Sequence, residues 1–294
     1  MQLDLFLDTR AVVLNNRTIT ALGAHDLARA RSALDELRRE APEYDSLPAL
    51  QTLIDAYASW RLPPPDAAAH AACAAWVARV VEPAARLGMG DAGRGFAAHF
   101  RRELALAARN LPFDAGYPTA HAAYAWLKGG DYAQAETAVL AVPEWWRHAD
   151  LLYWVSLARH RLRGLPAARP TLFALAWRAP QRLEALVSEL ADDLLTRDWR
   201  AALRDRAWEN TEAGQVAAWF PAWYLVEHSA TSRELDPALA PDTPPARAAC
   251  LVQHILDAEK PGDLRALAQQ RDKLRALHAG LFGFYMDKRR TRLI

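Results

Sequence analysis

The chain has 294 residues, of which 52% are hydrophobic and 24% are charged. It carries 36 basic and 35 acidic residues, so its formal net charge at pH 7 is +1. This is a globular composition with ample material for a core, and it excludes a disordered chain or a disulfide scaffold. The near-neutral total also argues against a strongly basic nucleic-acid binder, although it leaves room for a local basic patch.

The first element is the string QLDLF, which comprises Gln2, Leu3, Asp4, Leu5 and Phe6. It resembles the pentapeptide with which bacterial replication and repair proteins bind the sliding clamp. The resemblance implies that the Gln2 amide sits in a small pocket while Leu5 and Phe6 anchor the segment in an apolar groove. The same apolar residues could instead begin the first helix and pack inward.

Helical periodicity follows over most of the chain. Apolar residues recur three and four positions apart, as Leu27, Ala30, Leu34 and Leu37 do, and alternating β patterns are almost absent. Ala, Leu, Arg and Glu dominate, and these residues favour helix. Short Pro- or Gly-containing breaks separate the segments, which predicts an all-α fold of about a dozen helices.

Three segments share a helix–turn–helix pattern, at residues 24–42, 129–143 and 163–180. Gly130 and Gly164 lie 34 residues apart along the chain. The segments resemble the tetratricopeptide repeat family, whose unit is a 34-residue helical hairpin. The resemblance implies antiparallel hairpins stacked into a right-handed solenoid that binds a peptide or protein on its concave face, and it implies no catalytic residue.

The resemblance is partial and covers about a third of the chain. Arg169 stands where the family has a small residue, and the proline of the second segment comes early. The helix expected over residues 65–82 fits no repeat. After it, GMGDAGRG matches G-x-G-x-x-G from Gly88 to Gly93, but a dinucleotide site needs a preceding strand. We therefore expect a flexible loop between two helices there.

Eleven tryptophans are present, and apolar periodicity assigns most of them to the core. Trp145 and Trp146 are adjacent, so only one of them can face inward squarely on a helix. Together with Trp177 in the third repeat segment, they are the candidate aromatic contacts for a partner.

Residues 219–228 form the densest aromatic segment, WFPAWYLVEH. Pro221 is expected in the first turn of a helix. Glu227 and His228 follow and could perform acid–base chemistry, which makes an all-α active site the enzymatic alternative. A structural role for this pair is the interpretation we prefer, because no nucleophile or second base is placed beside it.

The sequence predicts no metal and no cofactor, because the nine histidines show no ligand spacing. Asp192 and Asp193 are interpreted as a solvated helix face beside Arg197. Cys73 and Cys250 lie in Ala-rich helical stretches and are expected to be buried free thiols.

The C-terminal string MDKRRTRLI is basic and could contact phosphates or an acidic partner. With Arg101, Arg102, Arg161 and Arg163 it underlies a third hypothesis, a nucleic-acid accessory protein with a basic groove. The usual role of such a tail is to complement the end of the last helix.

We therefore predict a non-enzymatic bacterial adaptor that binds a protein or peptide partner and contacts nucleic acid only indirectly. Residues 1–7 form a clamp-binding peptide or cap, 8–228 the repeat domain, 229–245 a linker and 246–294 a C-terminal helical segment. The chain has no signal-peptide pattern and no run of about 18 apolar residues, so we expect a cytoplasmic protein with no membrane contact.

Overall fold

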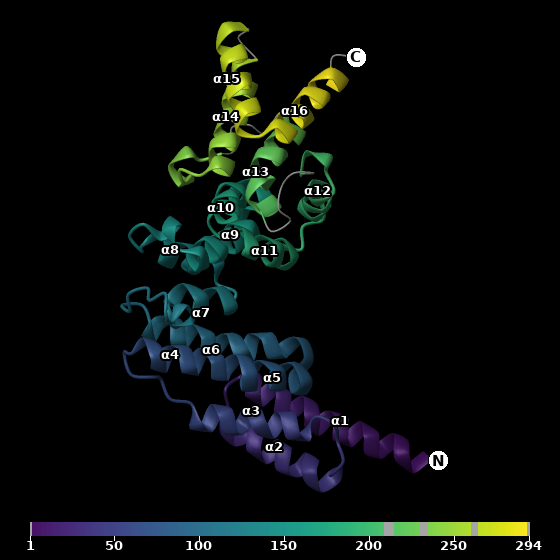
Figure 1. Ribbon diagram of the computed structural model, residues 1–294. Helices are drawn as coiled ribbons and strands as arrows, with labels where there is room; N and C mark the ends of the chain where they lie inside the picture. The colour runs from purple at the N-terminus through teal and green to yellow at the C-terminus, as the bar shows by residue number, and fades with distance from the viewer. Residues whose placement is uncertain (1, 209–214, 230–234, 260–263, 293–294) are drawn as a thin grey trace. The chain divides into compact units, whose positions relative to one another are not determined.

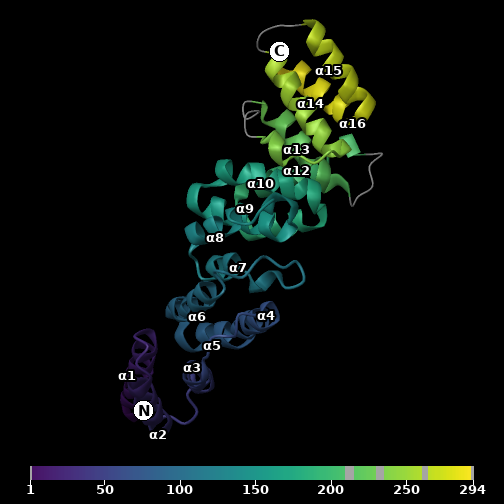
Figure 2. The same cartoon turned by 90° about the vertical axis from the view of Figure 1, so that its left-hand side faces the viewer.

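The computed structural model describes residues 2–208, 215–229, 235–259 and 264–292; within these ranges the side chains of residues 2–9, 264, 266 and 291–292 are outside the description. Every regular element in the described part of the chain is helical, which confirms the predicted all-α class (Figures 1 and 2). None of the described helices combines the length and apolar content that crossing a membrane requires.

The contacts among its residues divide the chain into two compact units, Met1–Ala138 and Val139–Ile294, here called unit 1 and unit 2. This division does not coincide with the predicted boundaries at residues 7, 228 and 245, which stay predictions. Residues 230–234 of the predicted linker lie outside the described residues.

Unit 1 is built from helices that pack against their neighbours in chain order, α1 on α2, α2 on α3, α3 on α5, α5 on α6 and α6 on α7. Its helices are α1 (Gln2–Gly23), α2 (Leu27–Glu40), α3 (Leu47–Ser59), α4 (Ala67–Trp76), α5 (Glu82–Met89), α6 (Gly93–Ala107) and α7 (Ala122–Lys128), and α8 (Tyr132–Leu140) crosses the limit between the units.

The predicted core face of α2 is confirmed. The Asp26 carboxylate accepts a hydrogen bond of 3.0 Å from the backbone N–H of Arg29, which satisfies a donor that the helix start leaves free. Ala30, Leu34 and Leu37 are buried at the spacing of one helix face, which packs the helix into the core of unit 1.

A π-helical turn, Val77–Val81, joins α4 to α5 in one continuous helix. The backbone N–H of Glu82 accordingly donates to the carbonyl of Val77, five residues back. Pro83 explains this turn, because proline has no N–H and its ring clashes with the carbonyl four residues earlier in a regular α-helix. The helix expected over 65–82 begins at Ala67 instead of residue 65, and it extends through the proline to Met89.

At the end of the π-helical turn, Glu82 pairs with the buried Arg101 and keeps 32% of its own side chain exposed. Arg101 of α6 has 1% of its surface exposed, and its Nε and NH2 groups donate to Glu82 Oε1 at 2.9 and 2.6 Å. Its NH1 group donates to the carbonyl of Ala74 at 3.0 Å, and the guanidinium lies 5.7 Å from the centre of the Tyr124 ring. Arg101 therefore links α4, α5, α6 and α7.

His25, in the turn between α1 and α2, packs against α6. This residue adopts a left-handed backbone conformation, with φ of 58°, and its ring lies 4.2 Å from His99 and 5.3 Å from Tyr57, centre to centre. Burial, and secondarily the neighbouring His99 imidazole, lower the pKa of His25, with Glu103 opposing them. A neutral His25 ring is therefore favoured in this stack.

Unit 2 contains the remaining helices of the described chain. They are α9 (Ala149–Arg163), α10 (Leu165–Arg178), α11 (Leu183–Leu190), α12 (Asp193–Leu203), α13 (Val216–Glu227), α14 (Pro244–Ala258), α15 (Leu264–Leu277) and α16 (Ala279–Arg292). Here α9 packs on α10, α10 on α13, α13 on α14, and α14 on α15.

The α9–α10 hairpin turns at Gly164, whose φ of 79° lies in the region that glycine adopts without strain. A buried hydrogen bond of 2.8 Å from the Ser156 hydroxyl to the Thr171 hydroxyl crosses between its two helices. Arg169 is buried in α10, where its guanidinium lies 5.1 Å from the centre of the Tyr224 ring of α13.

The expected place of Pro221, in the first turn of a helix, is wrong. The structure begins α13 at Val216, so Pro221 lies in the helix interior. A proline there costs one backbone hydrogen bond and strains the preceding turn. The surrounding segment, from Ala218 to Val226, is buried, and this apolar packing offsets the cost of the proline.

Candidate functional site

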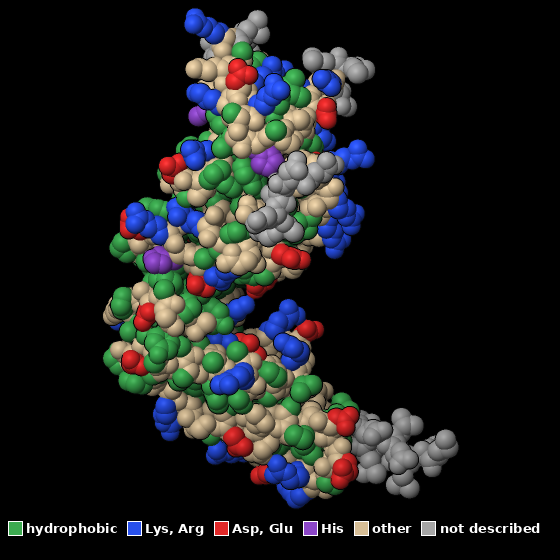
Figure 3. All heavy atoms as spheres, viewed as in Figure 1, with side chains coloured by type: hydrophobic (Ala, Val, Ile, Leu, Met, Phe, Trp, Pro, Cys, Tyr) green, Lys and Arg blue, Asp and Glu red, His purple; other side chains and the backbone are tan. Residues whose placement is uncertain are grey.

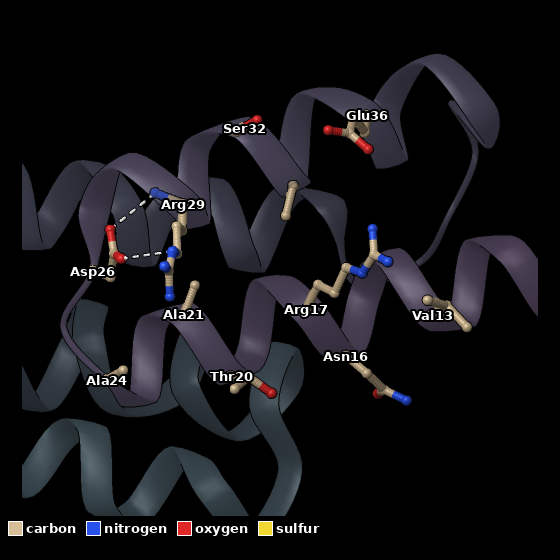
Figure 4. A pocket seen from close by; sticks show the side chains of 11 residues that line it. Val13, Asn16, Arg17, Thr20, Ala21, Ala24, Asp26, Arg29, Ser32 and Glu36 are labelled. Atoms are coloured by element: carbon tan, nitrogen blue, oxygen red, sulfur yellow. Dashed lines mark hydrogen bonds and ion pairs between the residues drawn. The ribbon is translucent and has the colours of Figure 1, made fainter.

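A groove of about 570 Å³ runs between α1 and α2 in unit 1 (Figure 4). We call it the α1/α2 groove. Each helix contributes one face to it, with residues three and four positions apart. Its walls and floor comprise Val13, Asn16, Arg17, Thr20, Ala21 and Ala24 of α1 and the turn, and Asp26, Arg29, Ser32, Ala33 and Glu36 on the side of α2.

Small side chains form the floor of this groove. Ala21 is buried and Ala33 is half-buried, and both line the groove where α1 and α2 lie side by side. Alanine lets two helices approach closely without a long side chain filling the surface between them. At one end Val13 keeps 43% of its surface exposed, which adds an apolar contact point.

The polar walls hold hydrogen-bonding groups that the described structure leaves unused. Asn16 and Arg17 are exposed on α1 and Glu36 is half-buried on α2, and none of the three side chains pairs with another described residue (Figure 4). Only Asp26 and Arg29 form an ion pair across the end of the groove, at 3.3 Å. An amide, a guanidinium and a carboxylate together can bind both donors and acceptors of a peptide backbone.

The predicted clamp-binding residues stand at the start of the same helix. The structure includes Gln2–Phe6 in α1, but the side chains of Gln2, Leu3, Asp4, Leu5 and Phe6 lie outside the described residues. Their proposed contacts stay predictions.

The three predicted aromatic contacts divide into two groups. Trp145 and Trp146 lie in a short 3₁₀ turn of unit 2, and both are half-buried, with their rings edge to face at 6.0 Å. The expectation that only one of them faces inward applies to an α-helix, whereas both residues lie in a 3₁₀ turn. Trp177 has only 7% of its surface exposed, so it packs in the core and offers little surface to a partner.

Glu227 and His228 each have a partner in unit 2. The Glu227 carboxylate pairs with Lys288 Nζ at 2.6 Å, and His228 Nε2 lies 2.8 Å from the buried Asp198 carboxylate. A carboxylate that orients an imidazole is a feature of catalytic sites and of structural networks alike. The basic tail residue Lys288 thus binds the chain's own α13, and Arg289 likewise pairs with Glu259.

Asp192 is not part of a solvated helix face. Its Oδ1 atom accepts the backbone N–H of Leu195 and so caps the start of α12, and its Oδ2 atom lies 3.2 Å from His160 Nε2. These bonds lower the pKa of the Asp192 carboxyl despite the opposing effect of burial, which is the largest single contribution. Asp193 follows as the first residue of the helix.

Arg101 is buried, so it does not line the predicted basic groove. Its guanidinium is enclosed by Glu82 and the Ala74 carbonyl, so it cannot reach a phosphate. On the face shown in Figure 3, basic and acidic side chains both appear over each unit. The prediction of a basic groove that includes Arg101 is therefore wrong.

The two cysteines are free thiols, as expected, but both are half-buried rather than buried. Burial raises the pKa of Cys73 and of Cys250, which favours the protonated thiol and opposes a nucleophilic role. No group of three or more His, Cys, Asp or Glu side chains that could hold a metal occurs among the described residues.

The glycines of GMGDAGRG shape a turn between two helices. Met89 ends α5, residues Gly90–Ala92 form a 3₁₀ turn and Gly93 begins α6. A helix precedes the turn, so the strand that a dinucleotide site requires is absent from this described segment.

Comparisons of this chain with protein-family models, with curated proteins and with solved structures found no match.

Sequence reasoning missed Asn16, Arg17 and Glu36. A signal for them exists: Val13, Asn16, Arg17 and Thr20 recur at helical spacing, which groups them on one face of α1. Periodicity alone does not say whether another helix covers such a face.

Proposed function

We propose that this protein is a non-enzymatic scaffold of stacked, tetratricopeptide-like helical hairpins that binds a segment of a partner protein in the α1/α2 groove. The observation that carries the proposal is the set of unpaired groups of Asn16, Arg17 and Glu36 above an alanine floor. Polar groups aligned along an open groove suit recognition of a peptide, whose backbone presents donors and acceptors at regular intervals.

The helical organisation supports this proposal. Consecutive helices pack side by side within each unit, which is the arrangement that a hairpin array requires. The three segments with the repeat pattern contain α2, α8 and α10, each of which forms as a helix. Such arrays present long surfaces to extended or helical partners.

Removal of Arg17 and Glu36 tests the groove. Peptides are first selected from a random display library against the purified full-length protein, and their Kd values are then measured by fluorescence anisotropy. We expect the double variant Arg17→Ala, Glu36→Ala to weaken groove-binding peptides at least about tenfold, since hydrogen bonds to charged groups contribute about 1.5–3 kcal/mol.

The matched control is Arg31→Ala, Asp35→Ala, which also deletes one base and one acid from exposed positions of α2 outside the groove. We expect this variant to bind like the wild type. If every selected peptide binds both variants and the wild type equally, the α1/α2 groove is not the binding site.

We further propose that Gln2–Phe6 links this scaffold to the replication sliding clamp. The string QLDLF resembles the clamp-binding pentapeptide, and it lies at the start of α1. Surface plasmon resonance with purified bacterial clamp should show binding by the wild type and a loss on the order of 30-fold in Leu5→Ala, Phe6→Ala, because both anchors are removed.

Leu7→Ala is the control for this clamp experiment, since it removes a neighbouring apolar side chain outside the pentapeptide. Equal affinity of the wild type and the Leu5→Ala, Phe6→Ala variant, or no binding by either, would refute the link to the clamp and leave the α1/α2 groove untouched.

A further inference from the structure

A second groove lies on another side of α1 in unit 1. It has a volume of about 770 Å³ and is bounded by α1, by the segment from Glu43 to Ala49 and by the end of α5. No residue lines both this groove and the α1/α2 groove, so the two surfaces are separate. We call it the α1/α5 groove.

Large apolar side chains form part of its interior. Ile19 and Tyr44 pack partly buried against the core of unit 1, and Met89 lies beneath the surface with 5% of its area exposed. Leu87 lines the same groove with 78% of its surface exposed, the largest fraction among the large apolar side chains of the described chain. A single exposed leucine is ordinary, but one that borders an apolar hollow offers a partner a contact on both sides.

The rim of this groove is acidic. Glu43 and Asp45 line it, both are exposed, and neither carboxylate forms an ion pair or hydrogen bond with another described side chain. No Lys, Arg or His is among the residues that line it. Two uncompensated carboxylates beside an apolar hollow attract a ligand with the opposite charge and repel an acidic one.

A side-chain hydrogen bond and a close helix contact fix the walls of this groove. The Ser46 hydroxyl donates to Asn15 Oδ1 at 2.6 Å, which ties the start of α3 to α1. Gly88 lies so close to α3 that a Cβ atom there would stand 3.2 Å from Leu50 Cδ2, so the end of α5 packs directly on α3. The walls therefore do not depend on a ligand for their positions.

We propose that the α1/α5 groove binds a partner segment in which a large apolar side chain is flanked by Lys or Arg. The apolar side chain enters the hollow beside Leu87, Ile19 and Tyr44. The flanking cations pair with Glu43 and Asp45 at the rim. This site extends the proposed scaffold function with a second surface of defined chemistry, and it does not require the α1/α2 groove.

Two synthetic peptide pools test this proposal with the full-length protein. Both carry one central Leu, Phe or Trp; one pool has Lys and Arg on either side, and the other has Asp and Glu. We expect the basic pool to bind, with an affinity that falls as salt is raised, and the acidic pool not to bind. Equal binding of the two pools would overturn the proposal.

Variants then locate the contact. The double variant Glu43→Gln, Asp45→Asn should lower the affinity for the basic pool at least about tenfold, because both rim charges are lost. The control variant Asp35→Asn, Asp55→Asn neutralises two exposed acids elsewhere in unit 1 and should leave this affinity unchanged. Leu87→Ser should weaken binding, whereas Leu106→Ser, at another exposed leucine, should not. All four variants change exposed residues, and circular dichroism should show unchanged folding.

The variant Arg17→Ala, Glu36→Ala separates this proposal from that of the α1/α2 groove. We expect it to bind the basic pool like the wild type. If it loses binding while Glu43→Gln, Asp45→Asn keeps it, the basic peptides occupy the α1/α2 groove and the second site is wrong.

Discussion

Replacing Arg101 with alanine should destabilise unit 1 by about 2–5 kcal/mol, the usual cost of truncating a large buried side chain. The substitution deletes two hydrogen bonds to Glu82 and one to the carbonyl of Ala74, and it leaves a hollow where the side chain was 1% exposed. Urea unfolding followed by circular dichroism should show the lower stability. Hydrogen exchange should locate the loss in residues 67–107.

Arg102→Ala is the matched control, because Arg102 is the next residue and is exposed. We expect its effect to stay within about 0.5 kcal/mol, as for most surface substitutions. A double-mutant cycle with Glu82→Gln then isolates the pair. If Arg101→Ala and Arg102→Ala unfold at the same urea concentration, Arg101 does not stabilise the fold.

Gly93→Ala should destabilise unit 1 by about 1–3 kcal/mol, the cost of overpacking. A Cβ atom on Gly93 would stand 2.2 Å from the carbonyl oxygen of Ala85, so α5 and α6 would have to separate. The obstacle is backbone rather than a flexible side chain, and it cannot rotate away. The midpoint of urea unfolding measures the effect.

Gly95→Ala, two residues further along α6, should have the opposite sign. Its Cβ atom would meet nothing within 4 Å, and alanine in a helix is favoured over glycine by about 0.5–1 kcal/mol. Two identical substitutions on one helix should thus move the unfolding midpoint in opposite directions. If both substitutions raise the unfolding midpoint, α5 and α6 can separate at Gly93 without a loss of stability.

Much of the fold could be predicted because it is encoded locally. The spacing of Ala30, Leu34 and Leu37 places α2 correctly, because it depends only on residues within a few turns. Proline and glycine breaks mark the ends of α2 and α10 for the same reason.

Features that depend on distant neighbours were predicted less well. Pro221 lies inside α13 because the packing around it outweighs its preference for a first turn. Arg101 is buried because a carboxylate from α5 and a carbonyl from α4 converge on it, and neither is near it in sequence. Asp192 caps a helix and contacts His160, a residue of another helix.

The candidate site could be predicted least of all. Asn16 and Arg17 look like an ordinary solvated face of α1 until the neighbouring α2 shows that they border a groove. The pentapeptide at Gln2–Phe6 is visible in the sequence because it is a contiguous string, whereas the groove is assembled from two helices. A surface formed by two elements leaves no compact pattern in either one.

The π-helical turn at Val77–Val81 determines the direction of the Glu82 side chain relative to the Ala74 carbonyl. Each residue of a helix advances the chain by about 100° of rotation. In a regular α-helix with the same number of residues, the Glu82 carboxylate would swing round the axis, away from Arg101, while the Ala74 carbonyl stayed in place. The π-helical turn therefore keeps the two partners of one guanidinium on the same side of the helix.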